Sequence, residues 1–227
     1  MKKYAIFDLD DTLLDFSRGE TEGITQIFQE NGVTDIDSLM QTYLTINHEI
    51  WHQIEQGADR GPLLDTRFAR TFATVGLSVD SIALEREYKA MLAHNYYTLP
   101  GASDLLTHLK QAGLTIIVAT NGTKSVQESR LAGAGITPYF DQIFISEDLG
   151  YDKPDQRFFA PIFTAYPQLT RDNALMIGDS LRSDILGARN AGLDNVWYNP
   201  QHLTNTSAVV PTYEAHDFSD LARLLLA

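Results

Sequence analysis

Cysteine is absent from this chain of 227 residues, which excludes disulfides, thiolate metal ligands and cysteine nucleophiles. Basic side chains are few: 17 Lys and Arg stand against 30 Asp and Glu, and the formal net charge is -13. That charge has the wrong sign for binding nucleic-acid phosphates or an anionic membrane surface, so we expect neither partner. No apolar run approaches the roughly 18 residues that span a bilayer, and the segment after Lys3 lacks the apolar region of a signal peptide. The sequence predicts a soluble, cytoplasmic protein.

Five short apolar runs predict buried parallel strands, because they lack the polar alternation of a half-exposed strand. They cover residues 4–7, 115–119, 142–145, 174–177 and 195–198. Helical patterns at 103–112, 124–134 and 184–191 each end before a glycine, which suits the left-handed position that closes a helix. Strands that alternate with helices predict an α/β fold with a doubly wound, mainly parallel sheet.

One interval is too long for this alternation. More than a hundred residues separate Asp8 from Thr115, whereas a strand-helix-strand crossover needs only about 30. Residues 16–98 carry helical patterns and no convincing strand. We therefore predict a catalytic core of residues 1–15 and 99–227, with an inserted α-helical cap domain of residues 16–98. Ligands bind beyond the carboxyl ends of the strands in such sheets, so an insertion at this point suits a lid.

Two acids, Asp8 and Asp10, directly follow the first predicted strand. Buried carboxylates without a partner would be costly. A hard cation removes that cost, and Mg2+ is the expected one because it binds one or two carboxylates, water and phosphate oxygens. Taken alone, this pair is also explained by an acidic turn that ends a strand.

Polar residues follow two further predicted elements. Thr120 ends the second strand, and Asn121 and Gly122 lead into a helix, where a hydroxyl and oriented backbone N–H groups favour an anion. Lys153 stands before Pro154 in a later loop. A helix cap explains the threonine and a solvated surface charge explains the lysine, if each is taken separately.

The fourth predicted strand is followed by Asp179, and Asp184 begins the next predicted helix. The topology therefore brings two pairs of acids, a threonine and a lysine to one rim of the sheet. That combination suits phosphoryl transfer. An aspartate attacks phosphorus, the metal and lysine neutralise the transferring oxygens, and a second acid protonates the leaving alkoxide.

Four segments of the chain resemble, in order and over essentially its whole length, the motifs of the haloacid dehalogenase superfamily of phosphatases. The segments are Asp8-x-Asp10-x-Thr12, Thr120-Asn121-Gly122, Lys153-Pro154 and Gly178-Asp179-Ser180-x-x-x-Asp184. The resemblance implies a Mg2+-dependent phosphomonoesterase that forms an aspartyl-phosphate and carries a helical cap. It implies Asp8 as the nucleophile and Asp10 as general acid and then base.

The same resemblance implies roles for the other motif residues. Thr120 and Lys153 would bind the phosphoryl group. Asp8, Asp179 and the backbone carbonyl of Asp10 would bind Mg2+, with Asp184 as a supporting acid next to these ligands.

The predicted cap resembles that of bacterial nucleotidases that act on non-canonical pyrimidine 5′-monophosphates. The shared features are Asn47, Trp51, Glu55-x-Gly57, Arg67-Phe68, Thr120-Asn121-Gly122 and Ile145-Ser146-Glu147. This resemblance implies a nucleoside monophosphate as the small phosphorylated substrate, with Asn121, Trp51 and Arg67 as substrate-binding residues. Two structural alternatives stand beside it: Trp51 belongs to the hydrophobic stripe of the cap, and Arg67 is an ion-pair partner on the surface.

Other functions compete with this interpretation. The enzymatic alternative is a phosphatase or mutase that acts on sugar phosphates or another small phosphometabolite. The non-enzymatic alternative is a phospho-acceptor signalling module of the receiver type, although receivers have their acidic pair ahead of a mid-chain acceptor. We expect a monomer or weak homodimer.

Overall fold

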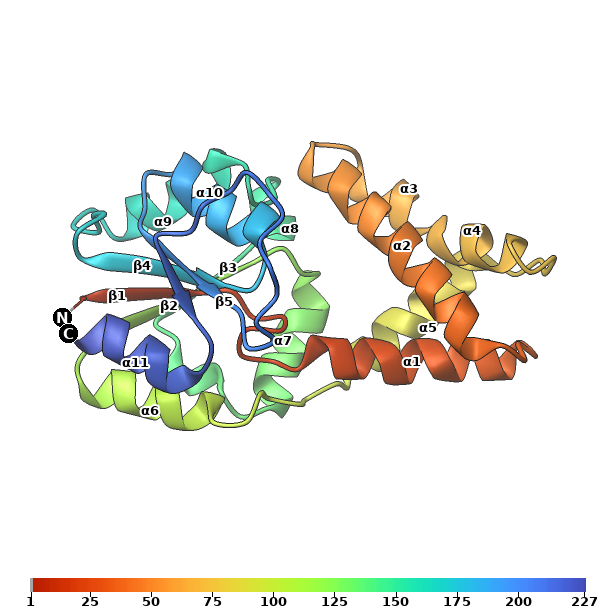
Figure 1. Cartoon of the computed structure of the whole chain (residues 1–227), viewed down its shortest axis with the longest axis horizontal. Coiled ribbons are helices and arrows are strands. Elements are labelled where there is room, and N and C mark those ends of the chain that lie inside the picture. Colours follow the sequence, from red (N-terminus) through yellow and green to blue (C-terminus); the bar gives the residue numbers. More distant parts are fainter. Residues whose placement is uncertain (1) are drawn as a thin grey trace. The chain divides into compact units, whose positions relative to one another are not determined.

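The computed structural model describes residues 2–227, which form two compact units. One unit joins the residues up to Phe16 to Tyr96–Ala227 and contains the sheet, and the other is the helical segment Ser17–Asn95 (Figure 1). Among the described residues, no helix is both long and apolar enough to cross a membrane.

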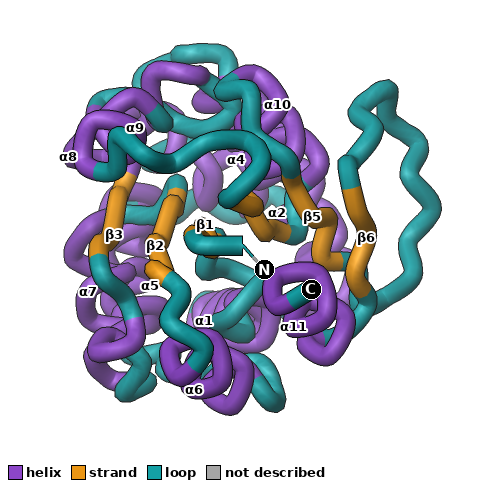
Figure 2. Tube along the Cα trace, turned by 90° about the vertical axis from the view of Figure 1, so that its left-hand side faces the viewer, coloured by secondary structure: helices purple, strands orange, loops and turns teal. Residues whose placement is uncertain are grey.

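All six strands of the sheet run parallel, in the order β3-β2-β1-β4-β5-β6. Figure 2 labels β3, β2, β1, β5 and β6 in this sequence across the sheet. The strands are β1 (Tyr4–Phe7), β2 (Thr115–Thr120), β3 (Gln142–Ile145), β4 (Ala174–Gly178), β5 (Asn195–Tyr198) and β6 (Tyr213–Ala215). Strand β1 lies between β2 and β4, so that Tyr4 is opposite both Thr115 and Ala174. The prediction of a doubly wound parallel sheet is confirmed. Strand β6 was not predicted, because its three residues at the sheet edge include two exposed ones and form no apolar run.

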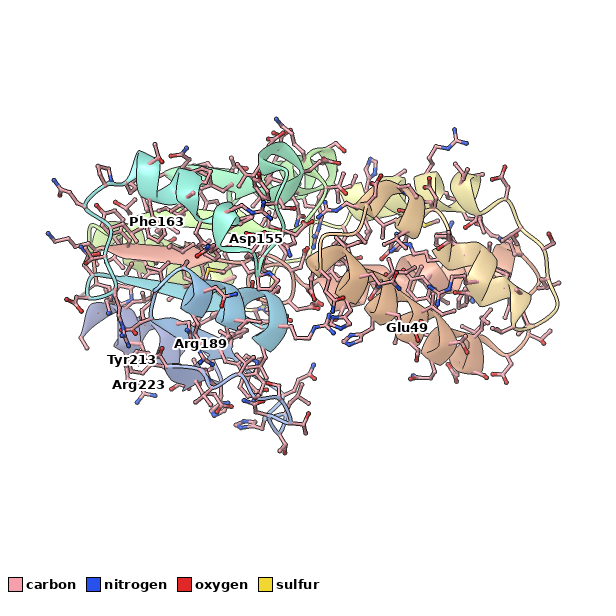
Figure 3. All side chains as sticks on the ribbon, turned by 90° about the horizontal axis from the view of Figure 1, so that it is seen from above. Glu49, Asp155, Phe163, Arg189, Tyr213 and Arg223 are labelled. Atoms are coloured by element: carbon pink, nitrogen blue, oxygen red, sulfur yellow. The ribbon has the colours of Figure 1, made fainter. Side chains whose placement is uncertain are left out.

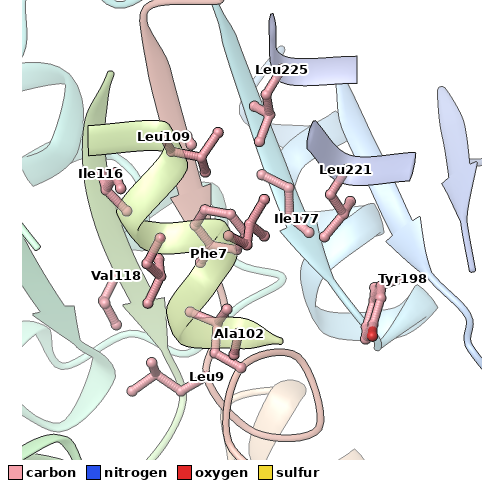
Figure 4. Packing of buried hydrophobic residues seen from close by; sticks show 14 of the residues in the cluster. Phe7, Leu9, Ala102, Leu109, Ile116, Val118, Ile177, Tyr198, Leu221 and Leu225 are labelled. Carbon is pink, nitrogen blue, oxygen red and sulfur yellow. The ribbon is translucent and has the colours of Figure 1, made fainter. Parts of the chain in front are cut away.

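Successive residues of the central strands face opposite sides of the sheet, and both sides are covered by helices. Phe7, Val118 and Ile177 pack on one side (Figure 4), together with residues of α6 (Ala102–Gln111), α7 (Lys124–Gly133) and α11 (Phe218–Leu226). Ile6 and Met176 pack on the other side, with residues of the 3-10 helix η2 (Gln156–Phe158), α9 (Ala160–Ala165) and α10 (Leu186–Asn190). Burial on both faces explains why these strands are continuous apolar runs.

The single α-helix predicted for residues 184–191 is wrong in its first part. The structure has a π-helical turn, η3 (Leu181–Ile185), followed by α10. The wide turn arises because the backbone N–H of Ile185 donates to the carbonyl of Ser180, five residues earlier. Pi-helical turns are frequent at functional sites, and this one carries Asp184. The remaining elements of the unit are the 3-10 helix η1 (Thr137–Tyr139) and α8 (Ser146–Leu149).

The second unit is entirely helical among its described elements. Its helices are α1 (Phe16–Glu30), α2 (Ile36–Glu55), α3 (Arg60–Leu64), α4 (Arg67–Ala73) and α5 (Ser81–Ala93). Asp35, Asp59 and Asp80 cap α2, α3 and α5, since each carboxylate accepts a hydrogen bond from a backbone N–H of the first turn. The interior is aromatic, with Phe28 packed edge-on against Phe72. On the surface, Glu49 of α2, labelled in Figure 3, pairs with Arg70 of α4.

Candidate active site

Strand β1 delivers Asp8 and Asp10 to the carboxyl end of the sheet. The backbone N–H of Asp8 donates to the carbonyl of Ile177 on β4, which extends the parallel pairing by one residue. Asp8 is 7% exposed, whereas the Asp10 side chain keeps 29% of its surface accessible. Asp11 turns the chain away at a left-handed φ of 52°. One acid is therefore held in the sheet and the other reaches toward solvent.

Lys153 enters this site from the loop before η2. Its ammonium lies 2.8 Å from Asp8 Oδ1, 2.6 Å from Asp184 Oδ1 and 2.5 Å from the carbonyl of Ala119. The residue is 1% exposed. Three acceptors satisfy the three ammonium hydrogens, so the charge is fixed in direction as well as in position.

The end of β4 supplies the other acids. Carboxylate oxygens of Asp8, Asp179 and Asp184 lie within 4.8 Å of one another. A Cβ on Gly178 would lie 2.2 Å from Asp184 Oδ2, so only glycine lets that carboxylate approach the strand. The same oxygen accepts a hydrogen bond from the backbone N–H of Ser180 at 3.0 Å. Asp184 is thus held between a backbone donor and Lys153.

Two side chains hold the backbone of Asp179. Its N–H donates to Thr12 Oγ1 at 3.1 Å, and its carbonyl accepts from Trp197 Nε1 at 2.8 Å. Thr12, which is fully buried, therefore connects the loop after β1 to the loop after β4. This contact explains the threonine of the first motif, because its hydroxyl holds the backbone of Asp179.

Burial and mutual repulsion make ionisation of the acids in this cluster unfavourable. Burial raises the pKa of Asp8 to about 8; Lys153 opposes the rise, while Asp184 and Asp10 add to it. Burial, together with Asp184 and Asp8, also raises the pKa of Asp179 well above its usual range. Burial alone would lower the pKa of Lys153, but attraction to Asp184 and Asp8 outweighs it and the pKa is raised. One ammonium does not balance three carboxylates.

A hard cation fits this donor set. The converging ligands are carboxylate oxygens only. Hard cations such as Mg2+ prefer oxygen ligands, whereas softer metals prefer sulfur or nitrogen. A dication would also neutralise the repulsion that raises the pKa of Asp8 and Asp179. The residues present are therefore compatible with the predicted Mg2+ site.

Thr120 lies at the carboxyl end of β2, and residues that the sequence analysis did not select surround it. Its Oγ1 accepts a hydrogen bond from Gln127 Nε2 at 2.9 Å. The same Gln127 nitrogen lies 2.9 Å from Asp10 Oδ2, and Arg130 forms an ion pair with Asp10 Oδ1. Gln127 and Arg130 were missed because a polar helix without motif spacing resembles a solvated surface.

The side chain of Asn121 is hydrogen-bonded to the backbone of Lys153. Its Nδ2 donates to the carbonyl of Lys153 and its Oδ1 accepts from the N–H of Lys153, both at 2.8 Å. These two hydrogen bonds use both ends of the side-chain amide. Asn121 therefore positions the backbone of Lys153, and its role in substrate binding stays a prediction.

Arg67 and Trp51 belong to the helical unit. Arg67 is 4% exposed and pairs with Glu85, with 2.7 Å between Nε and Oε2, while its Nη1 donates to Asn47 Oδ1 at 3.1 Å. The structure thus favours the ion-pair alternative for Arg67, in the interior rather than on the surface. Trp51 packs, partly buried, against a cluster of Ile46, Ile50, Ile54 and Leu64.

Comparison with known proteins shows the family of the chain. Residues 2–192 match the family model of haloacid dehalogenase-like hydrolases. The pyrimidine 5′-nucleotidase PynA of Streptococcus pneumoniae is 42% identical over 220 residues, which cover 96% of the chain and 93% of that protein. The pyrimidine 5′-nucleotidase YjjG of Escherichia coli is 31% identical over 222 residues, which cover 98% of the chain and 97% of that protein.

A solved structure is also similar over the full length. The crystal structure of the HAD-hydrolase YfnB of Bacillus subtilis, bound to magnesium, matches with a TM-score of 0.92 and 34% identity. The match covers 100% of the chain and 99% of that structure. The chain belongs to the haloacid dehalogenase-like hydrolases.

Proposed function

We propose that this hydrolase is a Mg2+-dependent phosphomonoesterase that acts on pyrimidine nucleoside 5′-monophosphates through an aspartyl-phosphate on Asp8. The observation that carries the proposal is the convergence of Asp8, Lys153, Asp179 and Asp184 at the carboxyl end of the sheet. The substrate class is supported by PynA and YjjG, both pyrimidine 5′-nucleotidases.

The proposed reaction assigns a distinct task to each side chain. A carboxylate oxygen of Asp8 bonds to phosphorus while the bond from phosphorus to the nucleoside 5′-oxygen breaks. The electron pair of that oxygen takes a proton from Asp10. Water then attacks the phosphorus of the aspartyl-phosphate and gives its proton to Asp10, which frees phosphate and restores Asp8. The Thr120 hydroxyl donates to one phosphoryl oxygen, and the Lys153 ammonium binds another by exchanging it for one of its present acceptors.

In this proposal Asp8, Asp179 and the backbone carbonyl of Asp10 hold Mg2+. When bound, the ion neutralises charge on the carboxylates and on the phosphoryl group. The magnesium in YfnB supports this choice of metal. Asp184 supports the site by holding Lys153 and the backbone of Ser180.

Several finer predictions accompany this proposal. The core of residues 1–15 and 99–227, the cap of residues 16–98, the cytoplasmic location and the monomeric or weakly dimeric state stay predictions. A phosphatase or mutase for sugar phosphates stays the alternative, since a mutase differs only in what attacks the aspartyl-phosphate. Membership of a hydrolase family argues against the receiver-like module.

A substrate screen tests the proposed function. Phosphate release is measured with Mg2+ for uridine, thymidine, cytidine, adenosine and guanosine 5′-monophosphates, ribose 5-phosphate and phosphoserine. We expect the highest kcat/KM for pyrimidine nucleotides and none for Asp8→Asn, which controls for contaminating phosphatases. A preference for ribose 5-phosphate over every nucleotide would favour the sugar-phosphate alternative.

A further inference from the structure

Helix α7 turns two buried polar side chains toward Asp10. Gln127 Nε2 lies 2.9 Å from Asp10 Oδ2, and Arg130 Nη1 donates to Asp10 Oδ1. Gln127 is 1% exposed and Arg130 is fully buried. The two residues are three apart and so share one face of the helix. Both oxygens of Asp10 thus accept hydrogen bonds from one rigid element, while 29% of its side chain remains accessible.

These donors are held in turn by further contacts. Arg130 Nη1 donates to Gln127 Oε1 at 3.0 Å, and the guanidinium carbon lies 5.5 Å from the centre of the Phe16 ring. Gln127 Nε2 also donates to Thr120 Oγ1 at 2.9 Å. Gln127 therefore bridges Asp10 and Thr120, which the proposed function assigns to the leaving oxygen and to the phosphoryl group.

Gly122 provides the space for this bridge. A Cβ at that position would lie 2.4 Å from Gln127 Nε2 and 2.5 Å from Gln127 Cγ, far inside van der Waals contact. Any side chain at residue 122 would displace Gln127 from Asp10 and Thr120. The close approach of Gln127 thus accounts for the glycine of the Thr120-Asn121-Gly122 segment.

We propose that Gln127 and Arg130 are positioning residues that fix the Asp10 carboxyl group for proton transfer and couple its orientation to the Thr120 hydroxyl. This inference rests on the proposed function. Asp10 gives its proton to the leaving oxygen as the phosphorus–oxygen bond breaks, and it regains a proton from the attacking water. Proton transfer of this kind requires hydrogen-bond geometry at the reacting atom. A carboxyl group that rotates freely would lose that geometry.

The cost of burying Arg130 also supports a role in positioning Asp10. A guanidinium buried without a partner costs several kcal/mol, and burial with a partner often gains little over apolar packing. Arg130 is therefore poorly explained by stability alone. Its ion pair reaches the accessible acid of the site rather than a surface carboxylate.

The leaving group separates this role from a purely structural one. Gln127→Leu, Gln127→Ala and Arg130→Lys are compared with wild type on uridine 5′-monophosphate and on 4-nitrophenyl phosphate, whose phenolate leaves without a proton. The measured quantity is kcat/KM, which reports formation of the aspartyl-phosphate. We expect losses of up to about 100-fold on the nucleotide and much smaller losses on the aryl ester. Glu128→Gln, on the exposed side of α7, is the matched control and should change neither value.

A double-mutant cycle tests the part played by Gly122. Gly122→Ala alone should reproduce the selective loss of Gln127→Leu, because the added methyl displaces the Gln127 side chain. In the Gln127→Ala background, the same Gly122→Ala change should cost little more. Strict additivity of the two changes would overturn the proposed bridge.

Circular dichroism and thermal melts identify which variants are folded. Equal losses on both substrates in folded Gln127→Leu and Arg130→Lys, or no loss in either, would overturn the inference. A wild-type protein that releases phosphate from neither substrate would instead contradict the proposed function on which the inference rests. A failure of the inference can therefore be distinguished from a failure of the proposed function.

Discussion

The ammonium nitrogen of Lys153 lies 2.8 Å from Asp8 Oδ1, and a second carboxylate, from Asp184, lies 2.6 Å away on the same nitrogen. Asp179 adds a third acid to the cluster. The single cation does not offset burial and mutual repulsion, so the pKa of Asp8 stays raised at about 8 and the pKa of Asp179 is raised well above its usual range. From this imbalance we expect folding stability to depend on both pH and metal.

In a chelator, we expect the free energy of unfolding to fall as pH rises from about 4 toward 8. The folded state keeps protons on Asp8 and Asp179 in this range, whereas the unfolded state has lost them, so deprotonation favours unfolding. Mg2+ should stabilise the protein more at pH 8 than at pH 5, because it binds the ionised carboxylates. Chemical denaturation at several pH values, with and without Mg2+, measures both effects.

Asp179→Asn is the control for this prediction. It removes one of the raised acids, so it should flatten the pH dependence in chelator and weaken the stabilisation by Mg2+. A wild-type protein whose stability in chelator rises between pH 5 and pH 8 would contradict the charge balance described for the site.

Two ion pairs on helix α4 provide a matched test of burial. Arg67–Glu85 and Arg70–Glu49 have the same nitrogen–oxygen distance of 2.7 Å, but their side chains are 5% and 1% exposed in the first pair and 39% and 54% in the second. Arg67→Met should cost about 3 kcal/mol of stability, because it leaves the buried Glu85 charge with only the more distant Lys89 ammonium, 3.4 Å away and 36% exposed. Arg70→Met should cost about 0–1 kcal/mol. Urea unfolding of the full chain gives both values, and equal costs would refute a structural role for Arg67.

A substitution of Trp51 tests whether the helical unit contributes to substrate preference. The side chain is only partly buried, so Trp51→Leu keeps apolar packing against Ile50 and Ile54 while it removes the aromatic face. If the ring stacks on the base, at about 1–3 kcal/mol, kcat/KM for uridine 5′-monophosphate should fall about 5- to 150-fold. Ribose 5-phosphate, which has the sugar and phosphate but no base, should change little.

Trp51→Phe retains an aromatic face and should recover part of the nucleotide activity. A uniform loss on both substrates, with a lower melting temperature, would assign Trp51 to packing alone. The nucleotide preference would then rest on the similarity to PynA and YjjG.

Strand ends made much of the site predictable from the sequence. Apolar runs without alternation indicated buried parallel strands, and parallel strands bring their carboxyl ends to one edge. Asp8, Thr120 and Asp179 meet there for that reason. The long interval after Asp8 likewise indicated an inserted segment, and the structure has a helical unit at Ser17–Asn95.

Contacts made by helix faces and loops were not predictable in the same way. Gln127 and Arg130 lie in a helix whose polar residues resemble a solvated surface, and only the turn after β1 brings Asp10 to them. The partner of Asn121 depends on the path of the loop at Lys153, which no local pattern encodes. The π-helical turn at Asp184 depends on a hydrogen bond from Ile185 to Ser180 that helix propensity does not indicate.

The most direct test of the account is chemical trapping of the phosphoryl group on Asp8. Asp10→Ala protein is incubated with Mg2+ and 4-nitrophenyl phosphate, which needs no acid for its leaving group, so that the aspartyl-phosphate forms but its hydrolysis lacks a base. After acid quenching and digestion, mass spectrometry locates the adduct. We predict one added phosphoryl group on Asp8, removable by hydroxylamine and absent from the Asp8→Asn, Asp10→Ala protein. Turnover of the ester by Asp10→Ala without any phosphoryl group on Asp8, or with the group on another residue, would contradict the proposed nucleophile.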